Sequence, residues 1–233
     1  MKIKYGMILA AGLGKRMQPI TLQTPKPLIH IDNKSLLDRA IELLINHGVK
    51  EIAINVHHLA DKIKKYVNKR QYKAKIIISH EQESLLDTGG GILKATKSFK
   101  EPFVVVNPDT LWNSTYSSEL RDLEDLYFKK KKPCLLLVNK NLSFDSSFKG
   151  DFNLHDAKIS RDNRNELIFT GLQILDQNIF NAIKDKIFSM NKIWDSLIKN
   201  NLLYGVESKQ KFYHLNTKEM YDKISKLSIT RQK

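Results

Sequence analysis

Cysteine is almost absent from this sequence, and long apolar runs are missing altogether. The single cysteine, Cys134, lies inside a short apolar stretch. An intrachain disulfide is therefore excluded, and we expect the thiol to pack in the core of a protein from a reducing compartment. No apolar run approaches the roughly 20 residues of a membrane-spanning helix, and the first residues do not have the layout of a signal peptide. We expect a cytoplasmic protein without a membrane partner.

Acidic residues are too few to balance the basic ones. The chain has 25 Asp and Glu against 39 Lys and Arg, which gives a net charge of +14. Such an excess of positive charge is typical of nucleic-acid-binding proteins. Salt-sensitive retention on a DNA column would identify a protein of this class. The lysines are nevertheless spread along the whole chain, and the dense run at residues 129–132 follows a predicted helix. We therefore expect part of the charge to serve an anionic substrate, and no nucleic-acid partner.

Two common phosphate-binding motifs are missing as well: the Walker spacing G-x-x-x-x-G-K-S/T and the third glycine of the dinucleotide fingerprint G-x-G-x-x-G. In their place an apolar strand, residues 5–10, ends in two glycines and two cations. Gly12 and Gly14 can adopt positive φ and let backbone N–H groups approach an anion. Arg16 and Lys26 add charged donors, and prolines on both sides restrict the backbone of Lys26. The stretch favours a phosphate-binding loop over an ordinary tight turn.

Strands and amphipathic helices alternate along the first part of the chain. Ser35 is a predicted N-cap for a helix through His47, and Gly48 ends it. Strands are expected at residues 51–56, 75–79, 103–107 and 134–138, and helices at residues 60–68 and 118–130. This alternation predicts an α/β fold with a doubly wound, mostly parallel, Rossmann-like sheet and helices on both faces. Ligands of such sheets bind beyond the carboxyl ends of the strands.

Two further stretches lie at such strand ends. Asp109 follows the apolar strand 103–107, where a carboxylate could hold Mg²⁺ against a phosphate, although Asn-Pro-Asp also suits a plain turn. Residues 81–91 precede a helix expected to open at Ile92 and include three consecutive glycines, which are costly to order. Close approach of a nucleobase and ribose would explain the glycines, and an ordinary loop before a helix is the alternative.

The opening stretch resembles the signature of the sugar-phosphate nucleotidyltransferases, L-A-A-G-x-G-x-R-L/M-x-P-x-T followed by P-K-P. The chain matches it from Leu9 to Met17, at Pro19 and Thr21, and at residues 25–27. Within that family, the string Leu86-Asp-Thr-Gly-Gly-Gly-Ile92 is most similar to the N-acetylmuramate-1-phosphate uridylyltransferases. The resemblance extends to about residue 217. It implies transfer of a nucleotidyl group from a nucleoside triphosphate to a sugar 1-phosphate, with release of pyrophosphate.

The resemblance also implies roles for individual residues. The implied catalytic residues are Arg16, Lys26 and Asp109. The implied nucleotide-binding residues are Leu9, Ala10, Ala11, Gly12, Gly14, Lys15, Glu81, Gly89 and Gly90, with Glu81 and either Gly89 or Gly90 reading the base. The implied sugar-binding residues are Asp109, Gly150, Asp151, Thr170 and Gly171. Asp109 and His214 are the implied metal ligands, for Mg²⁺ or alternatively Mn²⁺.

The expected organisation is a single domain with two lobes. We predict a nucleotide-binding lobe over residues 1–138, a smaller sugar-binding lobe with a covering helix over residues 139–227, and a basic tail over residues 228–233. Strands are expected at residues 203–206 and 212–215, and helices at residues 193–200 and 218–227. The last strand carries the main departure from the family pattern W-x-D-x-G-T, because His214 replaces its aspartate and Asn216 its glycine. An imidazole suits Mn²⁺ better than Mg²⁺ and could instead contact a phosphate as a cation.

Several substrates and one other class of protein stay open. UTP and N-acetylmuramate 1-phosphate are the preferred pair, which implies a role in peptidoglycan recycling. Mannose, heptose or glucose 1-phosphate with another nucleotide is the nearest alternative, and a catalytically idle nucleotide-sugar binding protein is a second. The Glu-Lys-Pro element of the thymidylyl enzymes is missing, which argues against that subgroup. The sequence contains no hexapeptide repeat, so we do not expect a bifunctional N-acetylglucosamine enzyme.

Overall fold

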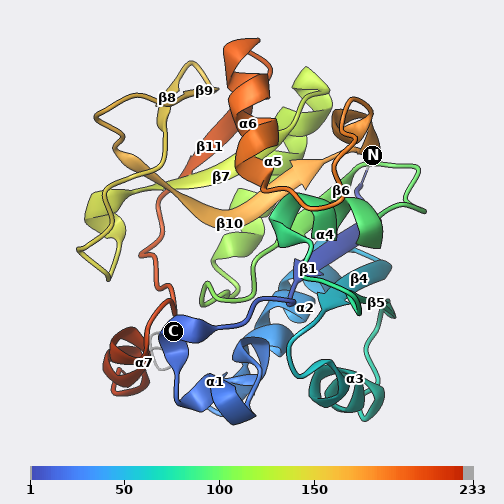
Figure 1. Cartoon of the computed structure of the whole chain (residues 1–233). Helices are drawn as coiled ribbons and strands as arrows, with labels where there is room; N and C mark the ends of the chain where they lie inside the picture. The colour runs from blue at the N-terminus through green and yellow to red at the C-terminus, as the bar shows by residue number, and fades with distance from the viewer. Residues whose placement is uncertain (1, 228–233) are drawn as a thin grey trace.

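A nine-stranded sheet forms the centre of the computed structural model, which describes residues 2–227 (Figure 1). The predicted tail at residues 228–233 lies outside the described residues. The strands of this sheet are β1 (Tyr5–Leu9), β4 (Glu51–Val56), β5 (Lys75–His80), β6 (Phe103–Val106), β7 (Cys134–Asn139), β8 (Asn153–His155), β9 (Lys158–Ser160), β10 (Leu167–Leu175) and β11 (Tyr204–Ser208). The helices are α1 (Ile20–Gln23), α2 (Leu36–His47), α3 (Ala60–Asn68), α4 (Asp87–Ala95), α5 (Tyr116–Lys130), α6 (Met190–Lys199) and α7 (Lys218–Ser225). A two-stranded ribbon joins β2 (His30–Ile31) to β3 (Lys34–Ser35).

The strand order is β5-β4-β1-β6-β10-β7-β11-β9-β8. β1 pairs in parallel with β4 and β6, β4 with β5, and β7 with β11, whereas β10 runs antiparallel between β6 and β7. The predicted mostly parallel α/β fold is confirmed. Because β10 sits between β6 and β7, the two expected lobes share one sheet, and the expected boundary near residue 138 does not coincide with a break in it.

Helices cover both faces of the sheet (Figure 1). Apolar side chains of α2, α3 and α5 pack into one core layer, and those of α4 and α6 pack into the other. Cys134 of β7 is buried in the first layer, and burial raises the pKa of its thiol to about 12. The predicted core role of this cysteine is confirmed, and the thiol stays protonated and inert. None of the described helices is long and apolar enough to cross a bilayer.

Local signals located several elements correctly. The Ser35 hydroxyl accepts a hydrogen bond from the Asp38 N–H at 2.9 Å, and Gly48 takes φ 110° at the other end of α2. The predicted bounds of β4 and α3 match those observed. The sequence does not predict the hairpin of β8 and β9, because the turn residues Asp156 and Ala157 take positive φ and neither is the glycine that is usual in such a turn.

Three predicted elements differ from the structure. α4 begins at Asp87 rather than at Ile92, so the three glycines lie inside the helix. Residues 212–215 do not form a strand: Phe212 and His214 make single bridges to Ser143 and Thr110. α7 does not cover the sheet. Its buried Met220 and Ile224 instead pack in a separate cluster with Met17, Ile29, Ile31, Leu36, Leu111 and Leu215.

Candidate active site

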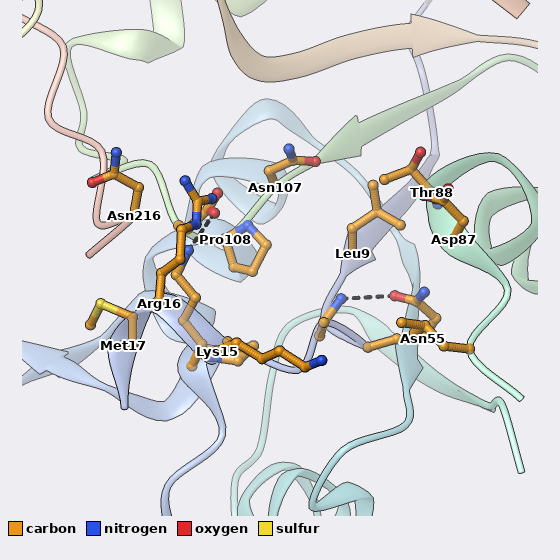
Figure 2. A pocket seen from close by; sticks show the side chains of 18 residues that line it. Leu9, Lys15, Arg16, Met17, Asn55, Asp87, Thr88, Asn107, Pro108 and Asn216 are labelled. Carbon is orange, nitrogen blue, oxygen red and sulfur yellow. Dashed lines mark hydrogen bonds and ion pairs between the residues drawn. The ribbon is translucent and has the colours of Figure 1, made fainter. Parts of the chain in front are cut away.

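A cavity of about 340 Å³ opens beyond the carboxyl ends of β1 and β6 (Figure 2). Its size is that of a small-molecule site. Its lining consists of Leu9, Ala10, Ala11, Gly12, Gly14, Lys15, Arg16, Met17, Lys26, Pro27, Asn55, Leu85, Asp87, Thr88, Asn107, Pro108, Asp109 and Asn216. The structure therefore brings the whole predicted opening loop together with Lys26 and Asp109. Figure 2 shows Arg16 pointing from this loop toward Asn216, and Lys15 pointing toward Asn55.

The two glycines of the opening loop have different reasons to be glycine. Gly14 takes φ 62°, and a Cβ there would lie 2.8 Å from Thr21 Cγ2, so the fold itself requires glycine. The Thr21 hydroxyl also donates a hydrogen bond to the Gly14 carbonyl at 2.8 Å. A Cβ at Gly12 would meet no protein atom within 4 Å. Since packing does not exclude a side chain at Gly12, close approach of a ligand is the better explanation for it.

Glu81, the residue predicted to read the base, is buried and hydrogen-bonded to protein groups. Glu81 is 1% exposed; its Oε1 accepts a hydrogen bond from Asn55 Nδ2 at 2.7 Å and its Oε2 one from the Leu86 N–H at 2.8 Å. Asn55 Oδ1 accepts a hydrogen bond from the Ala10 N–H at 2.8 Å, which is drawn in Figure 2. The pair therefore ties the end of β1 to the loop before α4, and both carboxylate oxygens of Glu81 are occupied.

Gly89 and Gly90 likewise pack against protein rather than facing the cavity. Their N–H groups donate to the Phe188 carbonyl at 2.9 and 3.1 Å. A Cβ at Gly90 would lie 2.2 Å from the Lys186 carbonyl oxygen. The assignment of Glu81, Gly89 and Gly90 to the base stays a prediction: none of the three lines the cavity, whereas Leu85 and the first α4 residues Asp87 and Thr88 do.

Asp109 is the electrostatic centre of the site. Its Oδ2 lies 2.6 Å from Lys26 Nζ and 3.1 Å from His214 Nε2, and its side chain is 22% exposed. Burial on its own raises the pKa of Asp109, but the neighbouring Lys26 and His214 outweigh this and hold the pKa well below its usual range. Asp109 is therefore a carboxylate at neutral pH, and the bridge between Thr110 and His214 keeps the imidazole beside it.

A divalent metal fits this cluster if the substrate completes its coordination. Within residues 2–227, Asp109 Oδ1, Asn107 Oδ1 and Asn216 Oδ1 are buried and have no hydrogen-bond partner. Oxygens of this kind suit Mg²⁺, which commonly takes one or two carboxylates together with substrate phosphates. No set of three His, Cys, Asp or Glu side chains in the described part of the chain is arranged to hold a metal. The protein thus offers a partial site, to which nucleotide phosphates would add the remaining ligands.

A second cavity of about 200 Å³ adjoins the first, with Asn107 and Asp109 lining both. Its other lining residues are Phe148, Asp151, Phe152, Arg161, Ile168, Phe169, Thr170, Gly171, Asn191, Trp194 and His214. The predicted sugar-binding residues Asp151, Thr170 and Gly171 are therefore brought together with Asp109. Gly150 does not line this cavity; it takes φ 85° in a turn where a Cβ would lie 2.4 Å from the Asn165 carbonyl oxygen.

Backbone geometry fixes the wall of the second cavity. The pairing of β10 with β7 is interrupted between Phe169 and Gln173, at a bulge that contains Gly171 with φ 91°. The Gly171 carbonyl accepts a hydrogen bond from the Asn107 N–H at 2.8 Å, which links this wall to the first cavity. Asp151 Oδ2 accepts one from the Phe169 N–H at 2.9 Å. No sequence motif points to Arg161 or Asn191, which also line this cavity.

The family model described as Nucleotidyl transferase matches residues 5–140. The chain belongs to this family. The match covers β1 to β7 and includes the whole opening loop, Lys26 and Asp109. The recognition made from the opening stretch is thereby confirmed.

Two curated relatives carry different substrates in their names. The N-acetylmuramate alpha-1-phosphate uridylyltransferase of Caulobacter vibrioides is 29% identical over 221 residues, which is 91% of either chain. The D-glycero-alpha-D-manno-heptose 1-phosphate guanylyltransferase of Campylobacter jejuni is 32% identical over 186 residues, which is 77% of this chain and 80% of the relative. Among solved structures, a UDP-glucose pyrophosphorylase complexed with UDP-glucose has a TM-score of 0.80 at 22% identity, covering 99% of this chain and 100% of the other. That likeness confirms the fold.

Proposed function

We propose that this chain transfers a uridylyl group from UTP to N-acetylmuramate 1-phosphate, giving UDP-N-acetylmuramate and pyrophosphate. The observation that carries the proposal is the pair of adjoining cavities with Asp109 in the wall of both. A triphosphate in the first cavity and a sugar phosphate in the second would meet at this carboxylate. The product would place the protein in peptidoglycan recycling.

The chemistry asks little of the protein beyond position and charge. The attacking oxygen belongs to a phosphate that is already ionised, so no general base is needed. The backbone amides of Gly12–Gly14 would cradle the triphosphate, while Arg16 and Lys26 would neutralise it as charge builds up around the α-phosphorus. A bound Mg²⁺ would supply further charge neutralisation beside Asp109. Asp151 and the backbone at Gly171 would orient the sugar.

The long alignment with the muramate enzyme supports the choice of substrates, because it covers 91% of this chain and 91% of that enzyme. The heptose guanylyltransferase is a second candidate, since the identity to that relative is similar over a shorter stretch. A nucleotide and sugar screen separates the two. Pyrophosphate release would be measured for four nucleoside triphosphates against N-acetylmuramate, N-acetylglucosamine, mannose, heptose and glucose 1-phosphates, with Mg²⁺ and Mn²⁺ in parallel.

We expect the fastest turnover with UTP and N-acetylmuramate 1-phosphate. Turnover with GTP and a heptose or mannose 1-phosphate would show that the proposed substrates are wrong and that the proposed type of reaction is right. Nucleotide binding by calorimetry without pyrophosphate release from any pair would indicate an idle binding protein and overturn the proposal.

Replacing His214 with aspartate should strengthen the metal site. A second carboxylate beside Asp109 adds an anionic ligand, so the Mg²⁺ concentration for half-maximal activity should fall roughly tenfold. In EDTA the two carboxylates repel each other, and the melting temperature should fall. His214→Asn is the matched control, because it removes the imidazole without adding charge. An unchanged Mg²⁺ requirement in His214→Asp would mean that the metal is held away from Asp109.

A further inference from the structure

Arg161 is a cationic side chain in the wall of the second cavity, to which the proposed reaction assigns no role. It follows β9 and lines the cavity together with Asn191 and Trp194 of α6. Its side chain is 30% exposed, so the guanidinium is accessible without lying free on the surface.

Several contacts hold the guanidinium in one orientation. Nε donates to the Asp151 carbonyl at 3.1 Å, Nη1 to Asp195 Oδ1 at 2.8 Å, and Nη2 to Asn191 Oδ1 at 3.0 Å. The Cζ atom lies 4.5 Å from the centre of the Phe152 ring. A guanidinium has five N–H groups, and these bonds leave one on each Nη. A planar cation fixed in this way loses little side-chain entropy when it binds an anion.

Stability alone does not account for this arrangement. The Asp195 side chain is 58% exposed, and an ion pair in such a position contributes about 0–1 kcal/mol. The carboxylates that line the cavity pair with groups other than Arg161: Asp109 pairs with Lys26 and His214, and Asp151 Oδ2 accepts the Phe169 N–H. Among the described residues that line this cavity, Arg161 and His214 are the basic ones; His214 faces Asp109, whereas Arg161 keeps two N–H groups beyond its three hydrogen bonds.

We propose that Arg161 is a specificity-determining residue that binds a carboxylate carried by the acceptor sugar. The inference rests on the proposed function and adds the substrate class to it: a sugar 1-phosphate with a second anionic group. Phe169 and Trp194 line the same cavity and offer apolar faces to a sugar ring. The lactyl carboxylate of N-acetylmuramate 1-phosphate is a group of this kind, and N-acetylglucosamine 1-phosphate is the same sugar without it.

The two sugar phosphates form a matched pair for the test. With UTP, kcat/KM would be measured for both in the wild type, in Arg161→Gln and in Arg164→Gln, an exposed arginine outside the cavity. Loss of charge-assisted hydrogen bonds should lower kcat/KM for N-acetylmuramate 1-phosphate about 10- to 100-fold in Arg161→Gln. The value for N-acetylglucosamine 1-phosphate should change less than about threefold, because a structural role alone would affect both substrates alike. Arg164→Gln should match the wild type.

Calorimetry with the same two sugar phosphates keeps the test independent of turnover. The wild type should bind the muramate more tightly, and Arg161→Gln should remove that difference. Equal affinity of the wild type for the two compounds, or equal losses for both in the variant, would overturn the role of Arg161 even if pyrophosphate is released. Absence of pyrophosphate release with the carboxylate-dependent difference intact would overturn the proposed reaction and leave the role of Arg161 standing.

Discussion

Asp109→Asn is expected to lower kcat about 1,000-fold or more, which corresponds to about 4 kcal/mol of lost transition-state stabilisation. The substitution keeps the size of the side chain and removes the charge that Lys26 and His214 now face. It also removes the carboxylate with a free buried oxygen in the wall shared by the two cavities. Turnover would be measured with saturating UTP and sugar phosphate, and folding by circular dichroism.

Asp156→Asn is the matched control for this experiment. Asp156 is an exposed turn residue with φ 49°, a conformation that asparagine also tolerates, and it lines neither cavity. The control should therefore turn over at the wild-type rate. If Asp109→Asn folds normally and keeps more than about a tenth of the wild-type kcat, the carboxylate that the reaction needs beside the phosphates belongs to another residue.

Gly90→Ala is expected to cause a large loss of stability, because Gly90 lies inside α4 where the helix packs against the segment around Lys186. Its Cβ would lie 2.2 Å from the Lys186 carbonyl oxygen, and backbone cannot rotate away as a side chain can. Overpacking of this kind costs about 3 kcal/mol, so the melting temperature should fall by roughly 6–12 °C. Because Asp87 and Thr88 of the same helix line the first cavity, the affinity for the nucleotide should also fall.

Gly12→Ala separates this effect from the general cost of replacing glycine. A Cβ at Gly12 would meet no protein atom within 4 Å, so the melting temperature should stay within about 2 °C of the wild type. Calorimetric titration with UTP would report nucleotide binding in both variants. A wild-type melting temperature for Gly90→Ala would show that the segment around Lys186 does not rest on α4 in solution.

The opening loop could be predicted from the sequence because its determinants are local. Strand, glycines and cations all fall within residues 5–27, and the geometry of Gly14 follows from its own φ and from Thr21. The contacts of Glu81 with Asn55 and of Gly90 with Lys186 could not be predicted, because these partners are distant in sequence. The contact between Gly90 and Lys186 joins segments nearly a hundred residues apart, and no local pattern announces it. Polar residues beside a glycine run look the same whether they face a ligand or brace a loop.

The second cavity shows the same limit. Asp151 and Gly171 belong to short family motifs and could be placed, whereas Arg161 is one of many basic residues in a chain with net charge +14. Its position depends on the hairpin of β8 and β9 and on α6, whose packing only the tertiary structure provides. β10 is inserted antiparallel between β6 and β7, and it pairs with segments that are distant in the sequence. Local hydrophobic periodicity does not specify which strands pair with each other.

That insertion also determines how the molecule can move. A hinge between two lobes needs a region that few contacts cross. Here β1 pairs with β6, β6 with β10 and β10 with β7. A hinge motion that separates the two lobes would therefore break the backbone hydrogen bonds between neighbouring strands. The continuous sheet therefore resists hinge bending between the lobes. Entry of substrates and release of products would then depend on movement of the loops at the edge of the sheet.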